Sequence, residues 1–165
     1  MSLTTSQLAA LKAAILADPV LAPLTSGPQS DVGRITDAMN ADASPAFIVW
    51  RTSVNPDDVM KNGMDWTRVD NLSIGKARIW DWMIRLGTFD PSRANIRAGI
   101  DAAWVGTSAD LAVRAVVYTH CKRSATRAEK LFANTSGGNG SDATPAVMVF
   151  EGMVQFNEIA ELFRV

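Results

Sequence analysis

The chain has 165 residues, of which 47% are hydrophobic and 20% are charged, and its formal net charge is −1. This length is typical of one domain that buries enough surface to fold without disulfides or a structural metal. The near-neutral charge argues against a dedicated non-specific DNA-binding protein or a membrane-surface protein. No apolar run reaches the roughly 18 residues that a transmembrane helix needs. We therefore predict a single globular domain over residues 1–165.

The charge is unevenly distributed along the chain. Residues 1–75 carry five basic and eight acidic side chains, residues 76–132 carry ten and five, and residues 133–165 carry one and four. A basic middle between two acidic ends either guides assembly with a partner or pairs within the chain. We expect internal pairing of most of these charges, because exposed ion pairs are common and individually weak.

The first predicted helix begins at a capping box. Thr4 and Gln7 have the required spacing, and Leu8, Leu11 and Ile15 follow at helical intervals. Asp18-Pro19 ends this helix, because the residue before proline is pushed out of the α region. Ser30 is then expected to cap a second helix.

Three further helices are predicted in the middle of the chain, each from its start and stop residues. A helix start is indicated by proline at the first helical position and acidic residues in the first turn, and a helix end is indicated by glycine after the last turn. These helices run from Asn55-Pro56 to Gly63, from about Ser73 to Leu86 with Ile79, Met83 and Leu86 inward, and from Asp90-Pro91 to Gly106.

A long helix is predicted from Ser108 to Phe132, with Thr107 or Ser108 as its cap. Small and apolar residues recur along it at intervals of three and four, which favours close packing against another helix. Its polar face is basic and carries Arg114, Lys122, Arg123, Arg127 and Lys130. Residues 134–144 follow with the glycine-rich composition of a flexible loop.

The C-terminal part predicts a β-hairpin. Ala146 to Phe150 reads as a strand, Glu151-Gly152 supplies a turn, and Met153 to Phe156 returns. Asn157 is expected to cap a last short helix, and Phe47–Arg51 is the candidate third strand. The predicted fold class is mainly α, with about six helices around one core and this small hairpin.

No constellation of residues in the chain predicts catalysis, a cofactor or a metal. His120 and Cys121 diverge because they are neighbours on a helix, and no second histidine or cysteine exists. Four acidic residues lie close in sequence without the spacing of a calcium loop: Asp57, Asp58, Asp65 and Asp70. The sequence around Gly137–Gly140 lacks the lysine and the following helix of a phosphate-binding loop.

Two groups of residues are instead candidates for binding a protein partner. Tryptophan is enriched at interfaces, and Trp66 in a polar stretch is the first candidate for exposure, with Trp82 second. The candidate partner-binding residues are Trp66, Arg114, Arg123, Arg127, Lys130, Val147, Val149 and Glu151.

Several segments resemble those of a known family in the same order. These are Trp50-Arg51-Thr52, Asn95 to Gly99, Ala125 to Phe132, and Phe150-Glu151-Gly152. The chain thereby resembles a family of small uncharacterised proteins encoded by tailed bacteriophages and prophages, from about residue 44 onward and in the opening segment 8–19. It departs from the family pattern with Asn55 before its proline. The resemblance implies a place among head and tail proteins and implies no reaction.

The leading function is therefore a non-enzymatic virion-assembly protein that binds other phage structural proteins or itself. Such a protein would be cytoplasmic during assembly, in keeping with an N-terminus that has no signal peptide, and then part of the virion. One alternative is a nucleic-acid-associated factor that uses the basic helix 111–132. A second alternative is an enzyme with a carboxylate metal site at Asp57, Asp58 and Asp65. No membrane, small-molecule substrate or cofactor is expected.

Overall fold

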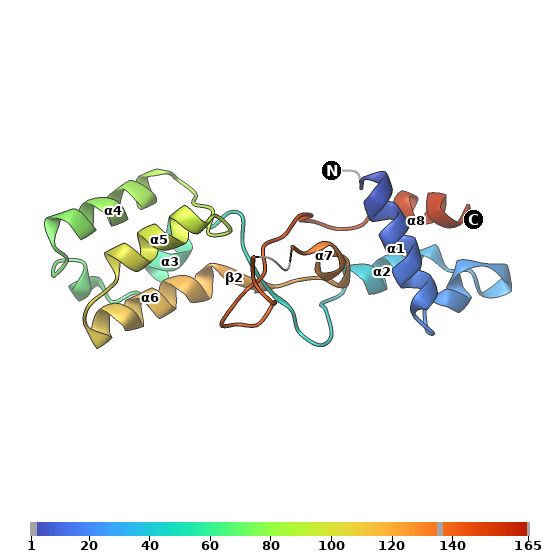
Figure 1. Cartoon of the computed structure of the whole chain (residues 1–165), viewed down its shortest axis with the longest axis horizontal. Coiled ribbons are helices and arrows are strands. Elements are labelled where there is room, and N and C mark those ends of the chain that lie inside the picture. Colours follow the sequence, from blue (N-terminus) through green and yellow to red (C-terminus); the bar gives the residue numbers. More distant parts are fainter. Residues whose placement is uncertain (1–2, 135–136, 165) are drawn as a thin grey trace. The chain divides into compact units, whose positions relative to one another are not determined.

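A computed structural model describes residues 3–134 and 137–164, and these are mainly helical (Figure 1). The mainly α fold class is thus confirmed, although the described residues hold more helices than the sequence predicts. The eight α-helices are α1 (Thr5–Ala17), α2 (Val32–Asn40), α3 (Pro56–Lys61), α4 (Ile74–Arg85), α5 (Ala94–Ala103), α6 (Ser108–His120), α7 (Arg127–Phe132) and α8 (Phe156–Phe163). Short 3-10 helices are η1 (Ala22–Thr25), η2 (Gly27–Gln29) and η3 (Trp66–Arg68), and the strands are β1 (Ile48–Trp50) and β2 (Lys122–Ser124).

The chain divides into two compact units. Unit 1 comprises Met1–Val49 and Ser124–Val165, and unit 2 comprises Trp50–Arg123. Each unit has its own group of buried apolar side chains. The prediction of about six helices around one core is therefore not what the structure shows.

Unit 1 packs α1, α2, α7 and α8 together, and its helix starts follow from local chemistry. The predicted capping box at α1 is present, with the amide of Gln7 donating to Thr4 Oγ1 at 3.3 Å. The second helix is capped by Asp31 rather than Ser30, because the Asp31 carboxylate accepts from the amide of Arg34 at 2.9 Å. The core of this unit includes Leu11, Ile15, Ile35, Met39, Phe132, Phe150, Val154 and Ile159.

Unit 2 contains α3, η3, α4, α5 and α6. Trp80 of α4 meets Trp104, which follows α5, edge to face with 5.3 Å between ring centroids. Gly99 lets the two helices approach closely, since a Cβ added there would lie 3.3 Å from the Met83 sulfur. The α5 helix begins after Arg93 instead of at Asp90-Pro91, because Asp90 accepts from the amide of Ser92 in a turn of its own.

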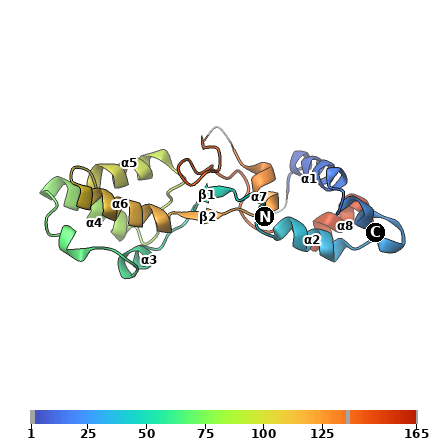
Figure 2. The ribbon, with the colours of Figure 1, turned by 90° about the horizontal axis from the view of Figure 1, so that it is seen from below.

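The predicted long helix from Ser108 to Phe132 is wrong. The α6 helix ends at His120, residues 122–124 form β2, and α7 begins only at Arg127. Two interactions compete successfully with helix continuation. The β2 strand pairs antiparallel with β1 (Figure 2), and Thr126 and Glu129 form a capping box that starts α7. The expected strand near Phe47–Arg51 is therefore present as β1, and its partner is β2.

The predicted C-terminal hairpin is also absent from the part of the chain that the structure describes. Ala146 makes a parallel bridge to Val49, and Val147 makes an antiparallel bridge to Asn134. Residues 150–155 form no strand, since Phe150 and Val154 turn into the core of unit 1. Burial of these two side chains outweighs pairing in a hairpin that is marginal in isolation. The last helix also starts earlier than expected, with Gln155 as its cap in place of Asn157.

The predicted flexible loop 134–144 includes two residues, 135 and 136, that lie outside the described residues. In the part that the structure shows, Asn139 Oδ1 accepts from the amide of Ser141 at 3.0 Å. Gly140 has a φ of +78°, and a Cβ there would lie 2.2 Å from the Phe47 ring. The glycine at this position is thus required for both its backbone angle and its contact with Phe47.

Candidate interaction site

The predicted basic face is divided between the two units. Arg114 lies on α6 in unit 2 and forms an ion pair with Asp101 at 3.4 Å. Arg123 is in β2 and also interacts within the chain. Arg127 and Lys130 lie on α7 in unit 1. The single basic helix on which the nucleic-acid alternative depended therefore does not exist.

The acidic residues proposed for a metal site have local structural roles. Asp57 pairs with Lys61 at 2.8 Å on α3, where acidic side chains in the first turn also favour the helix. Asp65 caps η3 by accepting from the amide of Thr67 at 3.0 Å. Across residues 3–134 and 137–164, no three histidine, cysteine or acidic side chains are grouped so that they could hold a metal ion.

Cys121 ends α6 and is fully buried, and burial raises the pKa of its thiol to about 12 from an ordinary value near 9. The thiolate fraction at neutral pH is thus much smaller than for a free cysteine, which makes the thiol a poor nucleophile. We expect Cys121 of the native protein to react with a disulfide reagent only as fast as local unfolding exposes the thiol. In urea-unfolded protein the thiol should react at once. Stopped-flow absorbance measures both rates.

The same buried thiol predicts a loss of stability at high pH. Above about pH 9 the unfolded chain releases the thiol proton while the native chain keeps it, so ionisation favours unfolding until the pH passes about 12. Cys121→Ala should flatten this part of the stability profile in urea titrations. Rapid native labelling at neutral pH would contradict both expectations.

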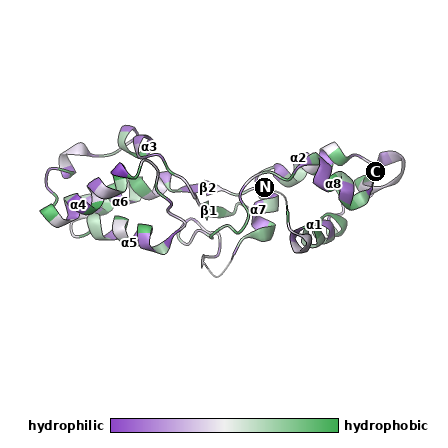
Figure 3. Cartoon of the chain, turned by 90° about the horizontal axis from the view of Figure 1, so that it is seen from above, coloured by the Kyte–Doolittle hydropathy of each residue, from purple (hydrophilic) through white to green (hydrophobic). Residues whose placement is uncertain are grey.

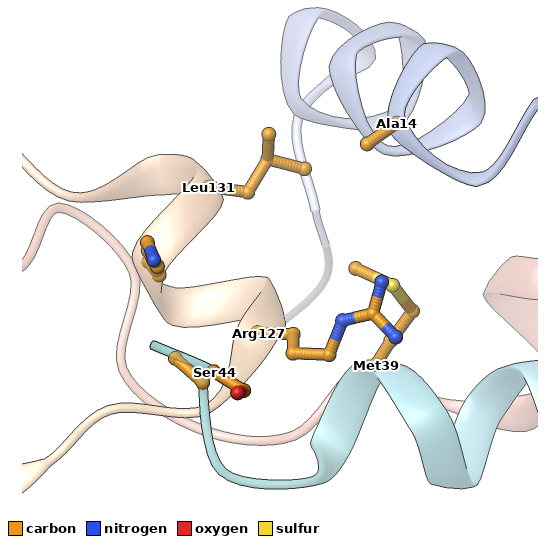
Figure 4. A pocket seen from close by; sticks show the side chains of 7 residues that line it. Ala14, Met39, Ser44, Arg127 and Leu131 are labelled. Atoms are coloured by element: carbon orange, nitrogen blue, oxygen red, sulfur yellow. The ribbon is translucent and has the colours of Figure 1, made fainter. Parts of the chain in front are cut away.

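A pocket of about 430 Å³ lies among α1, α2 and α7 in unit 1 (Figure 4). In Figure 4 the Arg127 guanidinium lies beside Met39, and Leu131 and Ala14 border the pocket from α7 and α1. Two of the predicted partner-binding residues, Arg127 and Lys130, therefore share one wall. The lining is Ala14, Met39, Ala43, Ser44, Arg127, Lys130 and Leu131.

Both cations of this pocket are already engaged. Arg127 contacts Asp18 at 2.5 Å, and this hydrogen bond holds the pKa of the Asp18 carboxyl below its usual value. Lys130 Nζ donates to the carbonyl of Pro45 at 3.2 Å and lies over the Phe47 ring. The pocket thus offers small apolar side chains and one hydroxyl, at Ser44, which suits the docking of an apolar group.

Unit 2 has a more prominent surface feature on α4. Ile74, Trp82 and Leu86 are 75%, 66% and 63% exposed and follow one another at multiples of four residues, with Leu86 directly after the helix. Figure 3 shows apolar and polar residues interspersed along α4. We call Ile74, Arg78, Trp82 and Leu86 the α4 face.

The tryptophans are distributed as the sequence suggests. Trp66 and Trp82 are exposed, whereas Trp50, Trp80 and Trp104 are buried. The prediction that Leu86 points inward is wrong, because it caps the C-terminus of α4 where the chain leaves the core. The sequence reasoning missed Ile74, although its spacing from Trp82, eight residues, was a visible signal.

The predicted residues from the C-terminal segment lie in different environments. Val147 is half-buried beside Asn134, while Val149 and Glu151 are exposed. The predicted partner-binding hairpin, Ala146–Phe156, also included Met153 and Phe156, which are exposed. These side chains therefore add an exposed apolar segment to unit 1, without the hairpin on which they were expected to lie.

Comparison with known proteins gives no relative from which a role for these surfaces could be inferred. No protein-family model, curated protein or solved structure matches the chain. Within the described part of the chain, none of the helices combines the length and the apolar character needed to span a membrane.

Proposed function

We propose that this protein is a non-enzymatic structural or assembly protein of a tailed bacteriophage or prophage, and that it acts through protein–protein contacts. It works in the cytoplasm during assembly and is carried into the particle. The resemblance of its segments to phage-encoded proteins supports the context. The exposed α4 face supports the mode of action and is the observation on which the proposal depends.

The binding free energy available from burying its apolar side chains favours a binding role for the α4 face. Full burial of an Ile, Leu or Trp side chain contributes about 1.5–3 kcal/mol, so three of them offset much of the roughly 4–15 kcal/mol cost of association. Tryptophan is also among the residues that most often dominate binding energy. Exposed apolar side chains gathered on one side of a helix and rimmed by polar residues are typical of protein–protein interaction sites.

The test uses the phage or prophage genome that carries this gene. Deletion is expected to reduce the yield of infectious particles, and mass spectrometry of purified wild-type particles is expected to detect the chain. A plasmid copy with Trp82→Glu should fail to restore the yield, because a glutamate at a central contact weakens binding by at least about 30-fold.

Leu111→Glu is the matched control for Trp82→Glu. Leu111 is also an exposed apolar residue of a helix in unit 2, but it lies on α6, away from the α4 face. This variant should restore particle yield as well as wild type does. Deletion that changes neither particle yield nor particle composition would show the proposed function to be wrong.

A further inference from the structure

The sequence contains two asparagine–glycine pairs, Asn62-Gly63 and Asn139-Gly140. Asparagine is chemically labile before glycine, because the glycine amide nitrogen is unhindered and its backbone can turn to attack the asparagine side chain. The structure gives these two pairs different surroundings. We therefore expect them to differ in reactivity while the protein is folded.

The Asn139-Gly140 pair is held in place by hydrogen bonds and packing. Asn139 Oδ1 accepts from the amide of Ser141 at 3.0 Å and from the hydroxyl of Thr144. Gly140 is buried against the Phe47 ring, and its amide donates to the carbonyl of Thr144 at 3.1 Å. Both the attacking nitrogen and the side chain that it would attack are thus engaged, so a reaction here requires several hydrogen bonds to break.

The Asn62-Gly63 pair is open to water. Both residues are exposed, and they follow the end of α3. The Gly63 amide donates no hydrogen bond to another residue that the structure describes. The Asn62 side chain is held by one hydrogen bond, from Nδ2 to the carbonyl of Asp58 at 2.8 Å. The attacking nitrogen of this pair is therefore accessible, and its target is only lightly restrained.

His120 contacts the peptide bond that joins Asn62 to Gly63. Its Nε2 lies 2.9 Å from the carbonyl oxygen of Asn62, and α3 packs against α6, whose last residue is His120. A carbonyl oxygen can only accept, so Nε2 carries the hydrogen and donates it. When the Gly63 amide loses its proton, negative charge spreads onto this oxygen. A donor already placed there stabilises the charge, as the donors of an oxyanion hole do.

We propose that Asn62-Gly63 is a site of spontaneous deamidation in the folded protein and that His120 promotes the reaction. The Gly63 amide gives its proton to water or hydroxide, and its nitrogen bonds to Asn62 Cγ. Nδ2 takes a proton from water and leaves as ammonia, so a cyclic succinimide remains. Water then opens this ring at Cγ to give aspartate, or at the backbone carbonyl carbon to give isoaspartate. The net change consumes water and releases ammonia, with no oxidation or reduction.

The modification changes the end of α3. A carboxylate at position 62 cannot donate to the carbonyl of Asp58, and it places negative charge at the C-terminal end of the helix, where negative charge is unfavourable. The inference concerns unit 2 alone and does not depend on the proposed function, so each can fail without the other.

Mass spectrometry of peptides from native protein aged at neutral pH measures both pairs in one sample. Asn62 should be converted faster than Asn139 in the native protein, whereas the two should be converted at similar rates in urea. Digestion with a protease that acts in acid prevents deamidation during sample preparation.

Substitution of His120 tests its role. His120→Ala should slow the conversion of Asn62 in native protein by about 2- to 10-fold, which is the effect of losing one hydrogen bond, and should leave the rate in urea unchanged. His120→Gln keeps a side-chain N–H donor and should retain more of the rate. Thr119→Ala is the matched control, because the Thr119 hydroxyl bonds within α6 to the carbonyl of Ala115, and its rate should equal that of wild type. Circular dichroism verifies that each variant is folded.

Two results would overturn the inference. If native Asn62 is converted no faster than native Asn139, the open pair is not a preferred site of deamidation. If folded His120→Ala converts Asn62 at the wild-type rate, His120 does not promote the reaction. The comparison of the two pairs uses wild-type protein alone, so it tests the site even where a variant fails to fold.

Discussion

Trp104→Ala is expected to lower the free energy of unfolding of unit 2 by about 3–5 kcal/mol. Trp104 has no exposed surface and lies edge to face with Trp80, so alanine leaves a cavity and removes the aromatic contact. All five tryptophans of the chain lie within residues 50–123. Tryptophan fluorescence during urea unfolding therefore reports on unit 2 and measures the change directly.

Trp104→Phe is the control that separates ring contact from the indole amine. Trp104 Nε1 is buried and has no hydrogen-bond partner among the described residues, so its removal eliminates an uncompensated polar group. Phenylalanine keeps an aromatic ring against Trp80 and should lose less than half as much stability as alanine. A free energy of unfolding for Trp104→Ala within about 0.5 kcal/mol of wild type, as for a surface substitution, would contradict this view of the core.

Glu129→Ala is expected to destabilise unit 1 by about 2–4 kcal/mol. The Glu129 side chain is buried, and its two oxygens accept from the amides of Thr126 at 2.9 Å and Gly152 at 3.1 Å. Alanine leaves both amides without this acceptor, at the start of α7 and where the C-terminal segment enters the core. Unit 1 contains no tryptophan, so far-ultraviolet circular dichroism should shift to lower urea while the fluorescence transition stays in place.

Glu158→Ala is the matched control for this second substitution. Glu158 also completes a capping box, at α8, and accepts from the amides of Gln155 and Leu3, each at 2.9 Å. It is half-buried, so water replaces part of what is lost, and we expect a cost of about 1 kcal/mol. Equal losses of unfolding free energy for the two variants would mean that burial does not increase the contribution of Glu129 to stability.

The two variants together test whether the units unfold separately. Separate unfolding predicts that Trp104→Ala moves the fluorescence transition, whereas Glu129→Ala moves part of the circular dichroism transition and leaves the fluorescence transition in place. Coincident transitions in both variants would instead support one cooperative domain, as the length of the chain suggests.

Much of the local structure was predictable from residues within a few positions of one another. Thr4, Asn55 and Thr107 cap their helices as expected, because each side chain accepts a hydrogen bond from an amide two or three residues later. The exposure of Trp66 followed in the same way from its polar neighbours. Interactions between residues this close in sequence depend little on the rest of the chain.

The candidate surfaces could not be predicted from short segments of the sequence, because they depend on contacts between residues far apart in the chain. Residues 122–124 have a helical pattern, yet they form a strand because the backbone near residue 50 pairs with them. Phe150 and Val154 were expected on a hairpin, yet they fill the core of unit 1 and leave Met153 and Phe156 outside. Strand pairing and core burial join residues that are far apart in sequence. A local preference for helix or hairpin is therefore overridden where contacts with distant residues bury more apolar surface or satisfy more backbone hydrogen bonds.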